Sequence, residues 1–231
     1  MRVVKEYDER YAEFLDVAQA LFYSQGYERT SVKEIIKDVG VAKGTFYHYF
    51  DSKAALLEAL VQTLIERLYA QLQSTLQPIL EDETTTGAEK FELLFARIGN
   101  WKLANPDFVW ESVRVFYQDE NVLLRAKMIE ASTAKMAPLF AQIIRQGVRE
   151  GSFDVAHPDE AAHLVFVLNQ TLSEAVAKMM LAGERKEAAM QQMGRKLTTY
   201  ERSVERILGA AEGSLHLIDL QHIEVWFSEQ G

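Results

Sequence analysis

Apolar residues recur along this chain at spacings of three and four, the period of an amphipathic α-helix with one buried face. The strict alternation of apolar and polar residues that is typical of a half-buried strand is almost absent. The pattern therefore predicts an all-α protein. We expect helices over residues 8–24, 31–39, 43–50, 52–80, 88–104, 107–117, 122–149, 159–181 and 185–211, and a short docked helix or strand within 215–227.

The first two predicted helices carry clear start and stop signals. Gly26 follows the first helix, where a residue in the left-handed conformation commonly ends a helix. Ser31 and Glu34 have the spacing of a capping box, so the second helix begins there, and Gly40 ends it. A third short helix follows directly after this glycine.

The third helix sorts its residues onto two faces. Phe46 and Phe50 lie four residues apart, so they share one face and are expected to pack on the apolar side of the second helix. The opposite face is left exposed, with Lys43, Gly44, Tyr47 and His48. Two short helices joined by a tight turn form a helix-turn-helix, whose second helix enters the DNA major groove. This segment therefore predicts binding to double-stranded DNA.

Each exposed residue type suits a contact with DNA. Gly44 has no Cβ, so the DNA backbone or base edges can approach closely. Lys43 and Lys53 would neutralise phosphates, and the Tyr47 hydroxyl would donate a hydrogen bond to one. The start of the second helix, with Lys33, offers a helix N-terminus and a positive charge to a phosphate or a guanine.

The stretch GVAKGTFYHYFDSKAALLEAL, residues 40–60, resembles the helix-turn-helix signature of TetR-type transcriptional regulators. In that family a glycine-valine turn leads into K-G-T-x-Y-x-x-F, followed by S-K and a leucine-rich helix. The resemblance covers about residues 8–69 and departs from the family at Ala42, where serine is common, and at Ile36, where alanine is common. The predicted DNA-binding residues are Ser31, Lys33, Ala42, Lys43, Gly44, Thr45, Tyr47, His48 and Lys53.

The resemblance implies a two-domain regulator. Residues 8–68 would form the DNA-binding domain, and residues 69–231 a helical ligand-binding and dimerisation domain. The implied function is that of a repressor, which a small apolar or aromatic inducer releases from its operator DNA. The inducer would move the helix over 52–80 and so change the separation of the two DNA-reading helices of a dimer.

The predicted helix over 185–211 has apolar positions in steps of 3, 4, 3, 4 and 3, which is a narrow heptad seam. Residues 164–168 are apolar all round, which indicates burial on two sides. TetR-type proteins form a four-helix bundle between subunits from their last two long helices, so we expect a homodimer; an intrachain helix pair is the alternative. The predicted interface residues are Leu168, Met190, Met193, Leu197, Tyr200, Val204 and Ile207.

The middle helices combine large apolar side chains with a few polar ones, which is the usual composition of a small-molecule site. Tryptophan or methionine at helical spacing is also common in an ordinary core, and that is the alternative interpretation. The predicted ligand-binding residues are Trp101, Trp110, Arg114, Tyr117, Met128 and Asn169.

Composition narrows the function further. The 231 residues include no cysteine, which excludes disulfides, thiolate metal sites and cysteine catalysis. The net charge is −9, but residues 27–53 hold five basic and four acidic residues, so this segment is near neutral. No apolar run approaches the length of a membrane span and the first residues lack a signal-peptide pattern, so we expect a cytoplasmic protein without a membrane partner.

Two rival functions deserve comparison with the regulator. Glu160 with His163, and Asp219 with His222, have the spacing of ligand pairs in di-iron helical bundles. The second pair lies in the tail, and an acid at the start of a helix suits the helix dipole, so we predict no metal, no cofactor and no enzyme activity. A TetR-like protein that binds only a partner protein is the other rival, and the DNA-suited residues argue against it.

Overall fold

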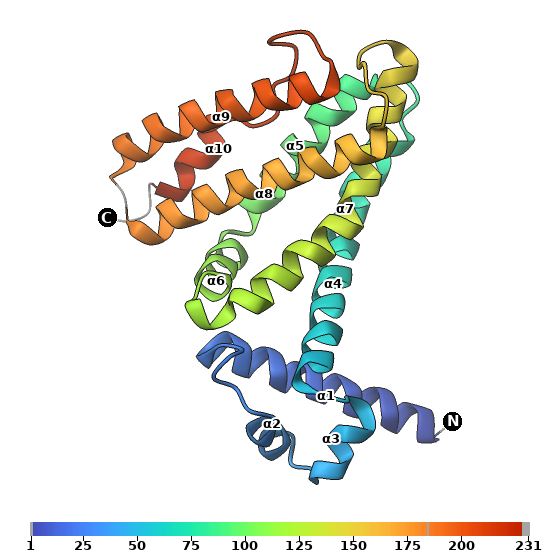
Figure 1. Ribbon diagram of the computed structural model, residues 1–231, viewed down its shortest axis with the longest axis vertical. Helices are drawn as coiled ribbons and strands as arrows, with labels where there is room; N and C mark the ends of the chain where they lie inside the picture. The colour runs from blue at the N-terminus through green and yellow to red at the C-terminus, as the bar shows by residue number, and fades with distance from the viewer. Residues whose placement is uncertain (1, 184, 228–231) are drawn as a thin grey trace. The chain divides into compact units, whose positions relative to one another are not determined.

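The structure is a computed structural model that describes residues 2–183 and 185–227, and these residues contain no β-strand (Figure 1). The all-α prediction is confirmed. The elements are α1 (Arg2–Gln25), α2 (Val32–Val39), α3 (Lys43–Tyr49), α4 (Lys53–Glu81), α5 (Gly87–Ala104), α6 (Pro106–Phe116), η1 (Asp119–Asn121), α7 (Val122–Glu150), α8 (Pro158–Ala182), α9 (Lys186–Leu208), α10 (Leu220–Glu224) and η2 (Val225–Phe227).

Two helix boundaries differ from expectation by several residues, and the tail adopts one of its two expected forms. The first helix begins at Arg2 instead of at residue 8. The ninth ends at Leu208 because Gly209 adopts a φ of 61°, the left-handed conformation that closes a helix. The tail forms the short helix α10 and not a strand, and the Asp219 side chain caps its start by accepting from the Gln221 amide at 2.8 Å.

The chain divides into two compact units. The first contains Met1–Arg67 together with Arg114–Ala131, and the second contains Leu68–Val113 together with Ser132–Gly231. The sequence predicted one division near residue 68, and the structure has a boundary between Arg67 and Leu68. Residues 114–131, however, group with the first unit, although they were expected in the second domain. Helices α4, α6 and α7 each contribute residues to both units.

The first unit has an aromatic core. Phe14 of α1 meets Phe46 and Phe50 edge-on, with ring centroids 5.7 and 5.8 Å apart. All three side chains are buried, and Ile35 of α2 and Leu57 of α4 are buried in the same cluster. The predicted packing of the third helix on the first two is confirmed, and it fixes which face of α3 remains exposed.

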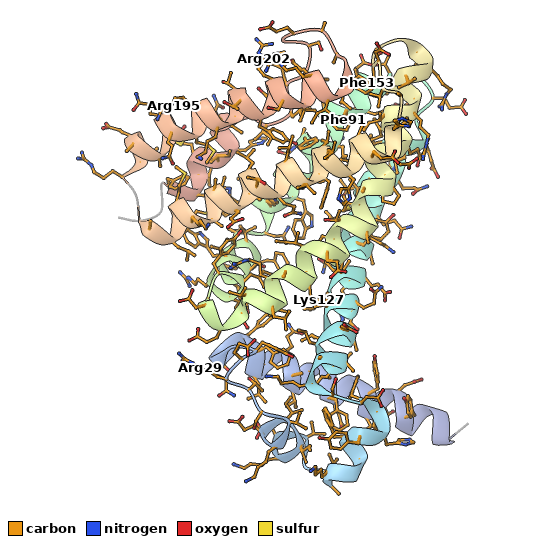
Figure 2. All side chains as sticks on the ribbon, in the orientation of Figure 1. Arg29, Phe91, Lys127, Phe153, Arg195 and Arg202 are labelled. Carbon is orange, nitrogen blue, oxygen red and sulfur yellow. The ribbon has the colours of Figure 1, made fainter. Side chains whose placement is uncertain are left out.

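The second unit is centred on Phe91 of α5. Its ring packs against Phe140 of α7 at 5.5 Å and against Phe153, which follows α7, at 6.2 Å (Figure 2). Helices α8 and α9 run side by side over this cluster (Figure 1). These contacts give the unit a continuous apolar core of its own.

Acidic side chains attach the tail to the second unit. Glu205 of α9 accepts from the Leu215 amide at 3.2 Å, and Glu92 of α5 accepts from the His216 amide at 2.7 Å. Burial raises the pKa of Glu205, but hydrogen bonds from backbone amides and from Arg202 outweigh it and lower the pKa below its ordinary value. Glu205 is therefore charged at neutral pH and holds the segment that follows α9.

The heptad seam of α9 faces inward. Met193, Leu197, Tyr200 and Val204 are buried in the core of this chain, and the Tyr200 ring packs 6.2 Å from that of Phe95. These four side chains pack into this chain's own core, which leaves little of their surface for a second chain. Their place in a dimer interface stays a prediction. The other three predicted interface residues keep partial exposure; they are Leu168, Met190 and Ile207.

Helix α8 has two different faces. Val165 and Phe166 are buried, whereas Leu164 is 54% exposed and Val167 is 42% exposed. Among residues 2–183 and 185–227, α8 alone is long and apolar enough to be a candidate membrane span, with a mean hydropathy of 1.2. Core helices meet the same criterion, and the buried face of α8 accounts for much of its apolar composition.

Candidate nucleic-acid interface

Helix α2 starts with the predicted capping box. The Glu34 amide donates to the Ser31 hydroxyl oxygen at 3.2 Å, and the Ser31 amide donates to the Glu34 carboxylate at 2.7 Å. The Ser31 hydroxyl also donates to this carboxylate at 2.7 Å. These bonds lower the pKa of Glu34 below its ordinary value. The Ser31 hydroxyl therefore serves the cap first, and Lys33 is the exposed positive charge of this turn.

A glycine turn sets the angle between α2 and α3. Gly40 has a φ of 76°, and its amide donates to the carbonyls of Ile36 and Lys37 at 3.1 Å. Ala42 is the exposed N-cap residue of α3 and makes no side-chain cap hydrogen bond, as expected from its missing hydroxyl. The turn is short, with only three residues between the end of α2 and the start of α3.

Helix α3 exposes the residues that the sequence analysis assigned to DNA. Lys43, Gly44 and His48 are exposed, and Tyr47 is 47% exposed. Thr45 is partly buried. A Cβ built at position 44 would meet no atom within 4 Å, so the chain itself does not require glycine there. The same short helix thus carries a buried aromatic face and an exposed polar face.

Lys53 has a different environment from the one expected. Its ammonium group donates to the carbonyls of Tyr27 at 2.8 Å and of Thr30 at 3.0 Å, and it lies 4.0 Å from the centre of the Tyr27 ring. Two of its three N–H groups are thus directed into the loop between α1 and α2. This placement favours a role in holding the loop over a direct role at a phosphate.

Sequence reasoning missed the residues that fasten this loop. Asn121, which is fully buried, accepts from the Tyr27 amide at 2.7 Å and donates to the carbonyls of Phe22 and Val115 at 3.0 Å. Arg29 of the loop, labelled in Figure 2, forms an ion pair with Glu120, the residue before Asn121. The polar stretch QDEN around residue 120 gave no local signal for these contacts, because their partners lie far away in the sequence.

The predicted ligand-binding residues fall in both units. Trp101 and Trp110 are partly buried and pack against the core of the second unit. Asn169 also belongs to the second unit. The remaining three belong to the first unit; they are Arg114, Tyr117 and Met128. A hollow of about 510 Å³ in the second unit is lined by other residues. Its lining is Thr84, Thr85, Glu89, Glu92, Leu93, Ala96 and His216.

This hollow is not suited to an apolar inducer. Two carboxylates line it, and the His216 ring lies 3.6 Å from the Glu92 carboxylate. No three histidine or acidic side chains within residues 2–183 and 185–227 lie close enough together to hold a metal ion. Glu160 and His163, which have the spacing of a metal-ligand pair, are both exposed on the first turns of α8.

Two family models match the chain. The model described as bacterial regulatory proteins of the tetR family matches residues 14–60. The model described as a tetracyclin repressor-like C-terminal domain matches residues 109–202. Together they cover more than half of the chain, and the first includes the whole of α2 and α3.

Known proteins are similar over different parts of the chain. The transcriptional repressor KstR2 of Mycobacterium tuberculosis is 27% identical over 171 residues, which are 71% of this chain and 78% of that protein. The transcriptional regulator TtgR of Pseudomonas putida is 35% identical over 60 residues, which are 26% of this chain and 29% of that protein. Both are described as helix-turn-helix regulators.

Solved structures share the fold. A TetR-family transcriptional regulator from Pectobacterium atrosepticum aligns with a TM-score of 0.55 at 20% identity, over 88% of this chain and 96% of that one. The regulator FadR from Bacillus subtilis, solved in complex with stearoyl-CoA, aligns with a TM-score of 0.51 at 19% identity, over 89% of this chain and 100% of that one.

Proposed function

Because the chain belongs to the TetR family of bacterial regulatory proteins, we propose that it is a transcriptional repressor that binds double-stranded operator DNA through α2 and α3. It acts as a homodimer, and a small apolar or aromatic inducer releases it from the operator. A repressor works where the DNA is, in the cytoplasm. In this role the protein needs no cofactor and catalyses no reaction.

One observation carries the DNA-binding role: the division of α3 into two faces. Phe46 is fully buried while its neighbour Tyr47 is 47% exposed, so the helix is anchored by one face and free to enter a groove with the other. Lys33 and Lys43 are both exposed on the same two-helix unit and supply charge for phosphates. A helix that served only the core would have no reason to carry Gly44 and Tyr47 on its outer side.

Exposed apolar side chains on α8 support the homodimer. Leu164 and Val167 are exposed apolar residues three positions apart, and Leu181 is 45% exposed near the end of the helix. Large apolar side chains left exposed along one helix favour contact with another protein surface. A dimer through α8 and the outer side of α9 presents two copies of α3 to two half-sites of an operator.

The inducer role rests on Trp101 and Trp110, which lie partly buried beside the core of the second unit. Helices α4, α6 and α7 contribute residues to both units, so a ligand that shifts any of them acts on the DNA-binding part as well. Affinities for inducer and for operator are then reciprocally coupled. The six predicted ligand-binding residues remain a prediction.

Fluorescence anisotropy on labelled DNA tests the central claim. The probe is a duplex from immediately upstream of the protein's own gene, or one recovered by the protein from a random-sequence pool. We expect tight binding that weakens about a thousandfold between about 50 and 200 mM salt, because phosphate contacts release counterions. Tyr47→Ala should weaken binding at least about tenfold through the loss of a phosphate contact in each half-site.

Phe108→Ala is the matched control, since Phe108 is 46% exposed but lies on α6 in the second unit. It should leave DNA binding unchanged. Equal affinity of Tyr47→Ala and wild type in folded protein would remove Tyr47 from the DNA contact. Salt-insensitive binding, or no duplex bound by wild type even from a random-sequence pool, would argue for a protein that binds only a protein partner.

The fluorescent dye 1-anilinonaphthalene-8-sulfonate, which has aromatic rings and one sulfonate, tests the inducer role without knowledge of the natural ligand. Dye that occupies the inducer site should lower operator affinity, and operator should lower dye affinity by the same factor. Trp101→Ala and Trp110→Ala should weaken dye binding. Dye binding that is independent of DNA would refute this coupling.

A further inference from the structure

An aromatic cluster lies beside α3, and the proposed function does not use all of it. Tyr7, near the start of α1, stacks on Tyr49 of α3 with ring centroids 4.5 Å apart and an interplanar angle of 29°. Tyr7 also meets His48 edge-on at 6.1 Å, and His48 meets Tyr49 edge-on at 5.3 Å. The three rings therefore contact one another in pairs.

The cluster is anchored to the core of the first unit. Tyr49 lies 5.5 Å from the buried ring of Phe14, and Tyr11, one turn after Tyr7 on α1, lies 5.1 Å from the buried ring of Phe50. Tyr7 stacks on Tyr11 at 6.4 Å. The Tyr7 ring is thus supported by its own helix and by α3, and its position is defined although it is 42% exposed.

His48 gains a neighbour that an exposed histidine usually lacks. Exposed side chains change rotamer within nanoseconds, and they must be ordered when they enter an interface, which weakens binding. Ring pairs with centroids 4.5–7 Å apart in an edge-on arrangement attract each other. Tyr7 and Tyr49 are stacked on each other and both meet the His48 ring edge-on, so they form one aromatic wall beside it and restrict its orientation before DNA arrives.

We propose that Tyr7 is a positioning residue for DNA recognition: it holds the His48 ring in the orientation in which the imidazole hydrogen-bonds to one base pair of the operator. This inference rests on the proposed function and adds a residue of α1 to the DNA-reading surface. The imidazole can donate through one nitrogen and accept through the other, so its orientation decides which base edge it satisfies.

A purely structural role for Tyr7 makes a different prediction. If Tyr7 only stabilised the packing of α1 on α3, its loss would weaken binding to every duplex by the same factor. A positioning role instead changes discrimination at one base pair and leaves the other positions alone. Discrimination is therefore the measurement that separates the two roles.

The experiment uses the full-length protein and the duplex that wild type recovers from a random-sequence pool. Dissociation constants are measured for this duplex and for a set in which each base pair of one half-site is replaced in turn. His48→Ala identifies the base pair whose discrimination depends on His48. Tyr7→Ala should lower discrimination at that same base pair about three- to tenfold, the range expected for one restrained side chain.

Further variants complete the test. Tyr7→Phe keeps the ring and should restore wild-type discrimination, whereas Phe108→Ala removes an equally exposed ring from the second unit and should change nothing. In the His48→Ala background, Tyr7→Ala should have no further effect on discrimination, since the two residues act as a pair. Tyr7→Leu replaces Tyr7→Ala if circular dichroism shows that the alanine variant is unfolded.

Three results would overturn the inference. Equal weakening of Tyr7→Ala on all duplexes would assign Tyr7 to structure alone, and unchanged binding would remove it from recognition. Loss of discrimination at a base pair that does not depend on His48 would break the proposed pair. If wild type recovered no sequence from the pool, the proposed function itself would fail, a result that differs from these three because it appears before any substitution.

Discussion

Asn121 joins three segments of the first unit through one buried amide. Its oxygen accepts from the Tyr27 amide in the loop after α1, and its nitrogen donates to the carbonyls of Phe22 on α1 and Val115 on α6. A side-chain amide can satisfy donors and acceptors at once, which no apolar residue of the same size can do. Removing it takes away the acceptor of the Tyr27 amide, while the carbonyls of Phe22 and Val115 keep their bonds from the Gly26 and Gln118 amides, at 3.1 and 3.4 Å. An unpaired donor and an unfilled space are both unfavourable in an interior.

We therefore expect Asn121→Ala to lower the free energy of unfolding by about 2–4 kcal/mol. Urea unfolding followed by circular dichroism measures this change. The amide of Tyr27 should also exchange faster with solvent. Asp119→Ala is the control, because Asp119 lies in the same turn but is exposed. Equal unfolding midpoints for Asn121→Ala and the control would contradict the role given to this amide.

At Gly44 we expect one substitution to change stability and DNA affinity in opposite directions. It lies inside α3 with open space around the place of a Cβ, so alanine fits there. Gly44→Ala should raise the free energy of unfolding by about 0.5–1 kcal/mol because alanine favours helix more than glycine does.

The same substitution should weaken operator binding, since the added methyl group would occupy space that the DNA backbone or a base edge needs. Thermal unfolding and DNA anisotropy on one protein preparation test both effects. A variant that is more stable and binds as well as wild type would show that DNA does not approach residue 44.

At the scale of elements, two glycines in the left-handed conformation end α1 and α2, and their surroundings differ. Gly26, between α1 and α2, has a φ of 88°, and a Cβ there would overlap the Cβ of Glu120. Gly40, between α2 and α3, has a φ of 76° and open space where its Cβ would be. The turn at Gly26 is packed against the segment that follows α6. The turn at Gly40 has no such neighbour, so only its left-handed backbone conformation favours glycine.

Alanine at the two glycines should therefore give unequal effects. Gly40→Ala should lower the free energy of unfolding by about 1–2 kcal/mol, the penalty of the left-handed conformation. Gly26→Ala adds a steric overlap to this penalty and should be clearly more destabilising, about 3 kcal/mol or more. Thermal unfolding of both variants gives the comparison; equal losses would mean that the turn at Gly26 can move away from Glu120 without loss.

At the scale of the whole molecule, the inward direction of the α9 seam changes where a partner chain can bind. Tyr200 lies in the core, its hydroxyl has no hydrogen-bond partner within residues 2–183 and 185–227, and burial raises its pKa strongly. A charged residue at this position would disrupt the second unit and could not report on dimerisation. The exposed apolar residues of α8 are the better place for such a test.

We expect Val167→Lys combined with Leu164→Lys to convert the dimer into a folded monomer, because two charges would be buried at the interface without partners. Analytical ultracentrifugation at micromolar concentration measures the mass. Leu93→Lys is the matched control, since Leu93 is 39% exposed on α5. A double variant that sediments as a dimer would exclude this face of α8 from the interface.

The sequence by itself determined the features that depend on neighbouring residues. Helical periodicity predicted the all-α class, and the spacing of Ser31 and Glu34 predicted a capping box whose hydrogen bonds are present. The four-residue interval between Phe46 and Phe50 predicted which face of α3 is buried. These inferences succeeded because helix geometry and capping are set within four or five residues.

Only the tertiary structure decided what covers each apolar face and which polar groups are already engaged. A heptad seam predicts that one face of α9 is buried. The spacing is the same whether this face packs on the chain's own core or on a second chain. The sequence suggested that Lys53 binds a phosphate, but in the structure its ammonium group donates to two loop carbonyls. Asn121 and Tyr7 gained their roles from partners far away in sequence, and no local pattern encodes such contacts.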